Sequence, residues 1–146
     1  MKATHKPPTL DHQPDATPAE LLHGAAAYLR RHGWIQGDFF DLLTDEAFPP
    51  ACAMGAINVC AHGRPTLGSD DTADDTLTDA AIRAKRVLAA YLDPEYLTDG
   101  LLHERSAIDI IGDWNDQDGM TTELVAASLD DAADDWDRLH TTGGAR

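Results

Sequence analysis

The sequence predicts an all-α fold, a compact bundle of four to five helices around a central apolar helix. The chain contains 23 Ala but only nine Val and Ile residues, and Ala favours helix whereas β-branched residues favour strands. Residues 51–62 are apolar on nearly every side, which is typical of a helix surrounded by its own protein. A length of 146 residues fits a single domain built around this helix.

The first helix is expected to begin after Thr17 and to end before Gly33. Thr17 can cap the helix, Pro18 fits its first position, and Glu20 completes a capping box. The cations at 30–32 favour the negative end of the helix dipole, and the glycine that follows favours a stop. The helix is therefore bounded by signals at both ends.

The domain is expected to span residues 17–140. Residues 1–16 are rich in Pro and polar side chains, which cannot offset the entropy of their own ordering, so they predict a disordered tail. Residues 66–78 carry a run of Asp and predict an acidic loop, and residues 141–146 predict a frayed end. The sequence therefore predicts one ordered unit with two loose ends.

A third helix is expected over residues 79–92. Thr78 can cap it, and the Asp-Pro pair at 93–94 ends it. This helix is expected to direct Ile82, Val87, Leu88 and Tyr91 toward the core and Arg83, Lys85 and Arg86 toward solvent.

Two short elements and a long terminal helix complete the expected fold. The apolar residues within 39–43 predict a short helix or a packed turn, and Ser106 can cap a short helix that reaches Trp114. Thr121 can cap the last helix, which is expected to reach about Leu139.

The charge balance excludes several classes of partner. The chain holds 26 acids against 11 Lys and Arg, a formal charge of -15, which opposes direct binding to nucleic-acid phosphate or an anionic membrane. The chain has no run of about 18 apolar residues and no apolar signal region, and its two cysteines cannot form a disulfide framework. We therefore expect a soluble cytoplasmic protein.

The negative charge gathers in the carboxyl-terminal half. Residues 1–65 hold 7 acids and 5 bases, a net charge of -2, whereas residues 66–146 hold 19 acids and 6 bases, a net charge of -13. On the last helix the apolar residues share one side and the aspartates share the other, although like charges at this spacing repel. We define the acidic surface as Asp113, Asp116, Asp118, Asp130, Asp131, Asp134, Asp135 and Asp137.

Two interpretations of the acidic surface remain open. It is an ordinary solvated face that gives solubility, or it attracts a cationic partner and speeds their encounter. In the second interpretation the protein docks on a basic protein, in one form by mimicking phosphates and so occupying a nucleic-acid-binding protein. A third option is a homodimer in which the acidic surface serves only solubility.

The alternative function is a small enzyme or accessory protein of a biosynthetic pathway, with Cys52 in its pocket. A helix N-terminus lowers the pKa of a nearby thiol. His62 or His103 would then serve as the base of a Cys-His-Asp hydrolase, and Asp109 or Asn115 would orient it. No local signature of thiol hydrolases is present, and free cysteines are more often buried apolar residues. The possible pocket comprises Trp34, Cys52, Asn58, His62, Trp114 and Asn115.

No metal and no cofactor is expected. The stretch from Asp113 to Gly119 has the composition of a calcium loop, but its glycine comes one position late. In the register that corrects this, Val125 stands where a bidentate Glu is required. The histidines lack the spacing of zinc ligands, and the glycines form no phosphate-binding loop.

Three short motifs stand out along the chain. They are Gly33-Trp34-x-Gln36-Gly37, Cys52-x-x-Gly55-Ala56 and Trp114-Asn115-Asp116-x-x-Gly119-x-Thr121, followed by Glu123, Val125 and Leu129. Together they resemble a small helical domain family of unknown function found in actinobacteria and their phages. The resemblance covers about residues 18–139 and implies a compact single domain in which the third motif precedes a terminal helix. It implies no established activity or cofactor.

Overall fold

A computed structural model describes residues 16–67, 75–98 and 106–141 of the chain. These parts of the chain are helical, with two isolated β-bridges and no sheet, so the predicted all-α fold is confirmed. The helices are α1 (Pro18–His32), α2 (Ala53–His62), α3 (Asp75–Leu92), α4 (Glu95–Thr98), α5 (Ala107–Asn115) and α6 (Thr122–Thr141). Five of them match the expected elements, and α4 adds a single turn after α3.

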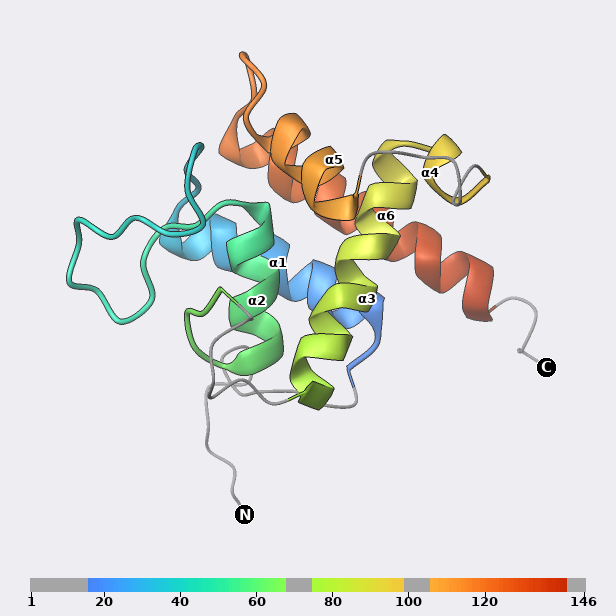
Figure 1. Cartoon of the computed structure of the whole chain (residues 1–146), viewed down its shortest axis with the longest axis horizontal. Coiled ribbons are helices and arrows are strands. Elements are labelled where there is room, and N and C mark those ends of the chain that lie inside the picture. The colour runs from blue at the N-terminus through green and yellow to red at the C-terminus, as the bar shows by residue number, and fades with distance from the viewer. Residues whose placement is uncertain (1–15, 68–74, 99–105, 142–146) are drawn as a thin grey trace.

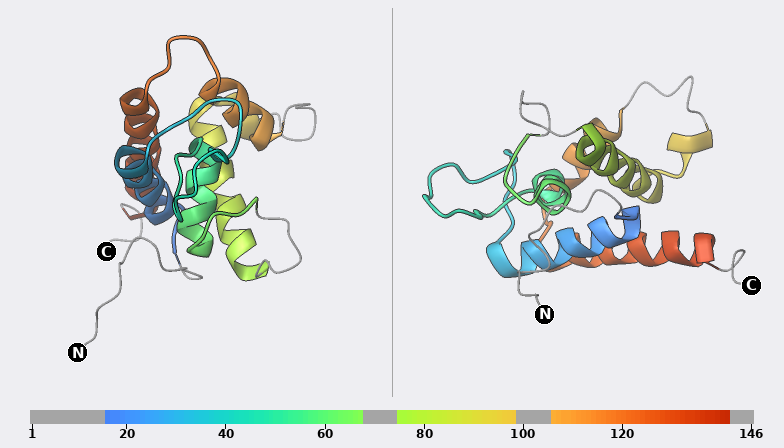
Figure 2. Two further views of the ribbon diagram at one scale, coloured as in Figure 1. Left: turned by 90° about the vertical axis from the view of Figure 1, so that its left-hand side faces the viewer. Right: turned by 90° about the horizontal axis from the view of Figure 1, so that it is seen from below.

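The helices form two layers. α1 and α6 lie side by side in one layer, and α2, α3 and α5 form the other (Figures 1 and 2). α2 contacts α1, α3 and α5, and each of its residues is buried. The prediction of a central apolar helix is therefore confirmed, although α2 begins two residues later than expected because Cys52 is its N-cap.

The capping box predicted for α1 is present. The Thr17 hydroxyl accepts the Glu20 N–H at 3.1 Å, and the Glu20 carboxylate accepts the Thr17 N–H at 2.8 Å. Ala16, assigned to the tail, is instead buried, and its carbonyl accepts a hydrogen bond from Arg83 at 3.4 Å. The rest of the expected tail, residues 1–15, lies outside the described residues.

The segment between α1 and α2 contains a turn where a short helix was one expectation. Phe40 is buried, but Leu42 and Leu43 are 84% and 99% exposed, so this turn does not pack its leucines. Asp41 accepts the Leu43 N–H at 3.0 Å and Thr44 accepts the Glu46 N–H at 3.2 Å. Such side-chain bonds to the local backbone compete with helix formation.

α3 differs from the prediction in its start and in its buried face. It begins at Asp75, so Thr78 lies inside the helix and the expected acidic loop 66–78 is shorter; residues 68–74 lie outside the described residues. Lys85, expected in solvent, is only 8% exposed, whereas Ile82 and Tyr91 are partly exposed. The buried face consists of Leu77, Ala80, Ala81, Ala84, Lys85, Leu88 and Ala89.

α6 begins where the sequence predicts and runs slightly further. The Thr121 hydroxyl accepts the Leu124 N–H at 3.1 Å, which is the expected N-cap bond. Thr141, assigned to the frayed end, is still helical, and residues 142–146 lie outside the described residues. In the described ranges, no helix combines the length and the apolar character needed to cross a membrane.

Candidate functional site

Asn115, at the end of α5, joins three segments that are far apart in the sequence. Its Oδ1 accepts hydrogen bonds from the Trp34 indole at 2.9 Å and from the Ala53 N–H at 3.1 Å. Its Nδ2 donates to the Ile35 carbonyl at 3.2 Å and to Asp116 at 3.1 Å. The buried amide thus uses both its acceptor sites and both its donors on the protein itself. We call this cluster, with Gln36 and Gly37, the Asn115 brace.

Gln36 and Gly37 extend the brace to the turn after α5. The Gln36 amide donates to the carbonyls of Asn115 and Gln117 at 3.1 and 2.9 Å. Gly37 has a φ of 89°, which favours glycine, and its N–H donates to Asp116 at 3.0 Å. The polar residues of the first and third motifs are therefore engaged in holding the chain together.

The second motif packs closely against the backbone of Phe39 at the start of α2. The Cys52 N–H donates to the Phe39 carbonyl at 3.0 Å, and the Cys52 sulfur accepts the Gly55 N–H at 3.4 Å. A Cβ at Gly55 would lie 2.3 Å from the Phe39 carbonyl oxygen, so the backbones approach too closely for any side chain. Gly55 is therefore required by packing.

The surroundings of Cys52 differ from those of an activated nucleophile. The thiol is buried, and burial raises its pKa, opposite to the lowering expected from the helix N-terminus. His62 lies ten residues further along α2, about 15 Å at 1.5 Å per residue. His103, the other expected base, lies outside the described residues.

The residues expected to share a pocket are only partly brought together. Cys52 and Asn115 line one hollow of about 90 Å³, well below the roughly 300 Å³ of a small ligand pocket. Asn58 is buried elsewhere on α2, where it donates to the Thr66 carbonyl at 2.9 Å. Trp114 lines a different hollow, between α5 and the end of α3.

Asp130, expected on the acidic surface, is part of the interface between α1 and α6. Arg30 donates to Asp130 at 2.7 Å and also forms two hydrogen bonds with Glu123, at 2.8 and 3.1 Å. These bonds raise the pKa of Arg30 and lower the pKa of Glu123. The negative charge of Asp130 is therefore compensated within the chain.

His23 binds two of the expected docking aspartates. Its Nδ1 lies 2.7 Å from Asp130 and its Nε2 lies 3.1 Å from Asp134. Burial lowers the pKa of His23, but the hydrogen bonds and charges of the two aspartates outweigh it and raise the pKa above 6.5. Because carboxylates only accept, two donors on one ring require the protonated imidazolium.

In the part of the chain that the structure describes, the ion pairs of His23 and Arg30 include no further member of the acidic surface. Asp118 and Asp131 are exposed and make no ion pair with any residue that the structure describes. Asp113 is also exposed, Asp116 accepts hydrogen bonds of the Asn115 brace, and Asp135 is paired with Arg138. The acidic surface therefore divides into compensated and uncompensated carboxylates.

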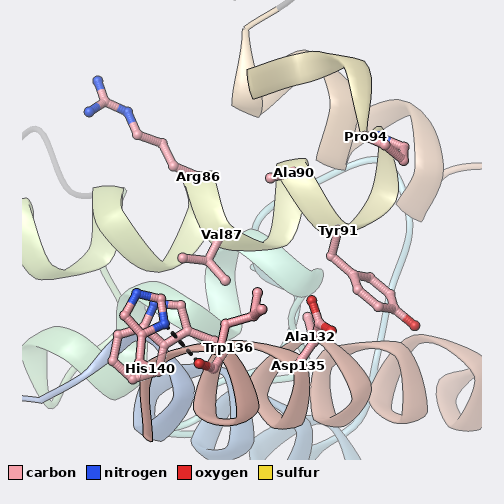
Figure 3. Close-up of a pocket in the computed structure, with 10 residues that line it drawn as sticks. Arg86, Val87, Ala90, Tyr91, Pro94, Ala132, Asp135, Trp136 and His140 are labelled. Carbon is pink, nitrogen blue, oxygen red and sulfur yellow. Dashed lines mark hydrogen bonds between the residues drawn. The ribbon is translucent and has the colours of Figure 1, made fainter. Parts of the chain in front are cut away.

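A groove between α3 and α6 lies beside the acidic surface (Figure 3). Its volume is about 480 Å³, within the range of ligand-binding cavities. We call it the α3–α6 groove. Its lining residues include Val87, Ala90 and Tyr91 from α3 and Ala132, Asp135, Trp136, Leu139 and His140 from α6, with Arg86 and Pro94 at its edges.

The sequence profile of a family of unknown function, DUF6197, matches residues 13–135. The chain belongs to this family. No curated protein and no solved structure matches the chain. The expected membership of a family of unknown function is thus confirmed, and the Asn115 brace lies wholly inside the matched range. The groove residues Trp136, Leu139 and His140 lie beyond its end.

Two features of this DUF6197 protein escaped sequence reasoning. Lys85 is buried on α3, where desolvation lowers its pKa, although it was expected in solvent with Arg83 and Arg86. The α3–α6 groove depends on how two helices meet, which periodicity does not report. No group of three or more His, Cys, Asp or Glu in the described ranges is placed to hold a metal ion.

Proposed function

We propose that this protein is a binding module whose acidic surface docks on a basic surface of a partner protein. The observation that supports the proposal best is that Asp118 and Asp131 are exposed and form no ion pair within the described ranges 16–67, 75–98 and 106–141. Asp134 is paired with His23, but its side chain remains 70% exposed and its charge still faces solvent. Uncompensated charge of one sign on rigid elements attracts a partner of the opposite sign.

In one form of this function, the partner is a nucleic-acid-binding protein and the aspartates replace the phosphates it normally contacts. A fixed row of carboxylates presents the same negative charge to Lys and Arg as a nucleic-acid backbone does. An origin among actinobacteria and their phages fits an inhibitor of this kind. A reducing cytoplasmic location fits the two free cysteines.

The proposal is tested with two variants of equal net charge. Asp118→Asn/Asp131→Asn removes uncompensated charge from the acidic surface. The control, Asp45→Asn/Asp79→Asn, removes two exposed carboxylates elsewhere. Each immobilised protein is used to retain binding proteins from a cell extract at about 50 mM salt, and the retained protein is quantified.

The expected result is that one protein is retained by the wild type and by the control variant. The acidic-surface variant should retain at least about tenfold less of it, and raising the salt to about 500 mM should release it. Added DNA should displace it if the partner is a nucleic-acid-binding protein. Equal retention by both variants, or binding that persists unchanged at about 500 mM salt, overturns the proposal.

A further inference from the structure

The α3–α6 groove presents apolar side chains, and the charge of Asp131 acts on Tyr91 in its lining. Val87 of α3 points toward Trp136 of α6 across it (Figure 3), and Ala90 and Ala132 also line it. Leu139, at the groove, is 63% exposed. A hollow bordered by two helices is where amphipathic helices of partner proteins commonly bind.

One wall of the groove is fixed in place. The Trp136 indole stacks on the His140 ring with centroids 3.9 Å apart and an interplanar angle of 15°. His140 Nδ1 lies 2.8 Å from the Trp136 carbonyl oxygen, and because a carbonyl only accepts, this nitrogen carries the proton. A wall that is already ordered loses little entropy when a ligand binds.

The electrostatic environment also differs between the two ends of the groove. Tyr91 lies toward one end, where burial, followed by the charges of Asp131 and Asp135, raises the pKa of its phenol. The carboxyl end of α3 adds the negative end of a helix dipole there. Arg86 lies on the other side of Val87 from Tyr91 (Figure 3). A cation on a ligand is therefore favoured at the Tyr91 end.

We infer that the α3–α6 groove binds an amphipathic basic helix of the partner protein. The apolar residues of this helix lie between Val87 and Trp136, and a Lys or Arg lies beside Tyr91 and Asp131. The inference rests on the proposed docking function and names the segment of the partner that is recognised. A cation close to the Tyr91 ring gains a cation–π interaction in addition to the attraction of the carboxylate.

The test uses a fluorescent peptide of about 14 residues, roughly four helical turns, with Leu and Lys at helical spacing. A peptide of the same composition in scrambled order, and one with Glu in place of Lys, serve as controls. The groove variant is Tyr91→Gln/Leu139→Gln. Its matched control, Ile82→Gln/Leu124→Gln, changes apolar residues on the same two helices that are similarly exposed, at 38% and 53% against 39% and 63%.

The expected result is that the amphipathic peptide binds the wild type and the control variant with similar Kd. The groove variant should raise the Kd at least about tenfold at both low and high salt, while circular dichroism shows unchanged helix content. Equal loss in the two variants, equal binding of the scrambled peptide, or equal binding of the Glu peptide overturns the inference. So does a wild-type dimer that the groove variant dissociates, because a second copy would then fill the groove.

The two proposals fail in different ways. Asp131→Asn should weaken the peptide chiefly at low salt, because it removes charge and leaves the apolar walls intact. If the groove variant has no specific effect while salt-dependent retention of the partner persists, the groove inference falls and the docking function stands. The opposite result is that the groove variant no longer binds the peptide, while neither the charge substitutions nor salt change the amount of partner retained. The docking function is then wrong, and the groove cannot be assigned to that partner.

Discussion

The Asn115 brace and the α3–α6 groove use their side chains in opposite ways. In the brace, both donors and both acceptor sites of the Asn115 amide are satisfied within the chain, and the adjoining hollow measures about 90 Å³. In the groove, apolar side chains stand partly exposed around about 480 Å³. A satisfied buried network fixes one structure, whereas exposed apolar surface next to charge is available to a partner.

This difference indicates which role the residues of the three motifs have. Their Trp, Gln, Asn and Gly residues hold the segment between α1 and α2, α2 itself and α5 together, so these residues stabilise the fold. The groove is built from common residues that form no motif, and part of its α6 wall lies beyond the residues that match the family. The residues that hold the fold together are therefore different from those of the groove that we propose for recognition.

The largest effect on stability is expected from Asn115→Ala. The substitution leaves the Trp34 indole N–H and the Ala53 N–H without their acceptor inside the protein. An unsatisfied buried donor costs about 1–3 kcal/mol, so the free energy of unfolding should fall by about 4 kcal/mol. Urea denaturation measures this, with Asp118→Ala in the neighbouring turn as a control that should change it by less than about 0.5 kcal/mol. Equal midpoints for the two variants would show that the brace is not needed for the fold.

The second prediction tests whether the brace hides a reactive thiol. Ellman's reagent at pH 7 should label Cys52 in a Cys60→Ser variant at least about a hundredfold more slowly in the native protein than in urea. A hundredfold corresponds to about 2.7 kcal/mol. The reason is that burial both shields the thiol and raises its pKa. Labelling of the native protein as fast as that of a small free thiol would instead favour an enzyme.

Much of the fold could be predicted from local signals. Thr17 and Glu20 predict the start of α1. The apolar run 51–62 predicts α2, and Thr121 predicts the start of α6. Each signal acts within a few residues, where geometry follows directly from sequence. The buried face of α3 was predicted only in part: Leu88 is buried as expected, but so is Lys85. Ala occupies several sides of this helix, and any of them could be buried.

The candidate site was harder to predict because it depends on contacts between distant residues. The bond from Trp34 to Asn115 spans 81 positions, and the bond from His23 to Asp130 spans 107. The helical projection placed Asp130 with the other aspartates, but in the structure Asp130 is bound by two residues of α1. The projection contained no information that α1 would bring Arg30 and His23 to that side. Charge patterns identify a candidate surface, and tertiary packing decides which charges stay uncompensated.

The third prediction compares two helical glycines, one packed against the Phe39 backbone and one with room for a side chain. Gly55→Ala places a Cβ 2.3 Å from the Phe39 carbonyl oxygen, so the backbone must move, and we expect a loss of about 2 kcal/mol. Gly112→Ala meets Met54 at an ordinary 3.7 Å and should stabilise α5 by about 0.5–1 kcal/mol. Thermal and urea unfolding of the pair measure both signs. Similar destabilisation by both would mean that helix context, and not the close approach to Phe39, sets the effect.

The smallest expected effect is a pH dependence that links α1 to α6. The pKa of His23 is raised in the folded protein, so its contribution to stability is complete below about pH 6.5 and is lost as the pH rises through the folded pKa. The side chain is 42% exposed, and after screening by solvent we expect about 0.5 kcal/mol. The deficit of His23→Gln relative to wild type should therefore be larger at about pH 6 than at about pH 8.5.

His32→Gln provides a control of opposite sign. Burial, followed by the charge of Arg31, lowers the pKa of His32, so this residue destabilises the fold as the pH falls through the unfolded pKa. Acidification should therefore favour His32→Gln over wild type, while it disfavours His23→Gln. If the deficit of His23→Gln is the same at both pH values, the imidazolium is not held by Asp130 and Asp134. Both aspartates would then be available to the acidic surface, with only Arg30 compensating Asp130.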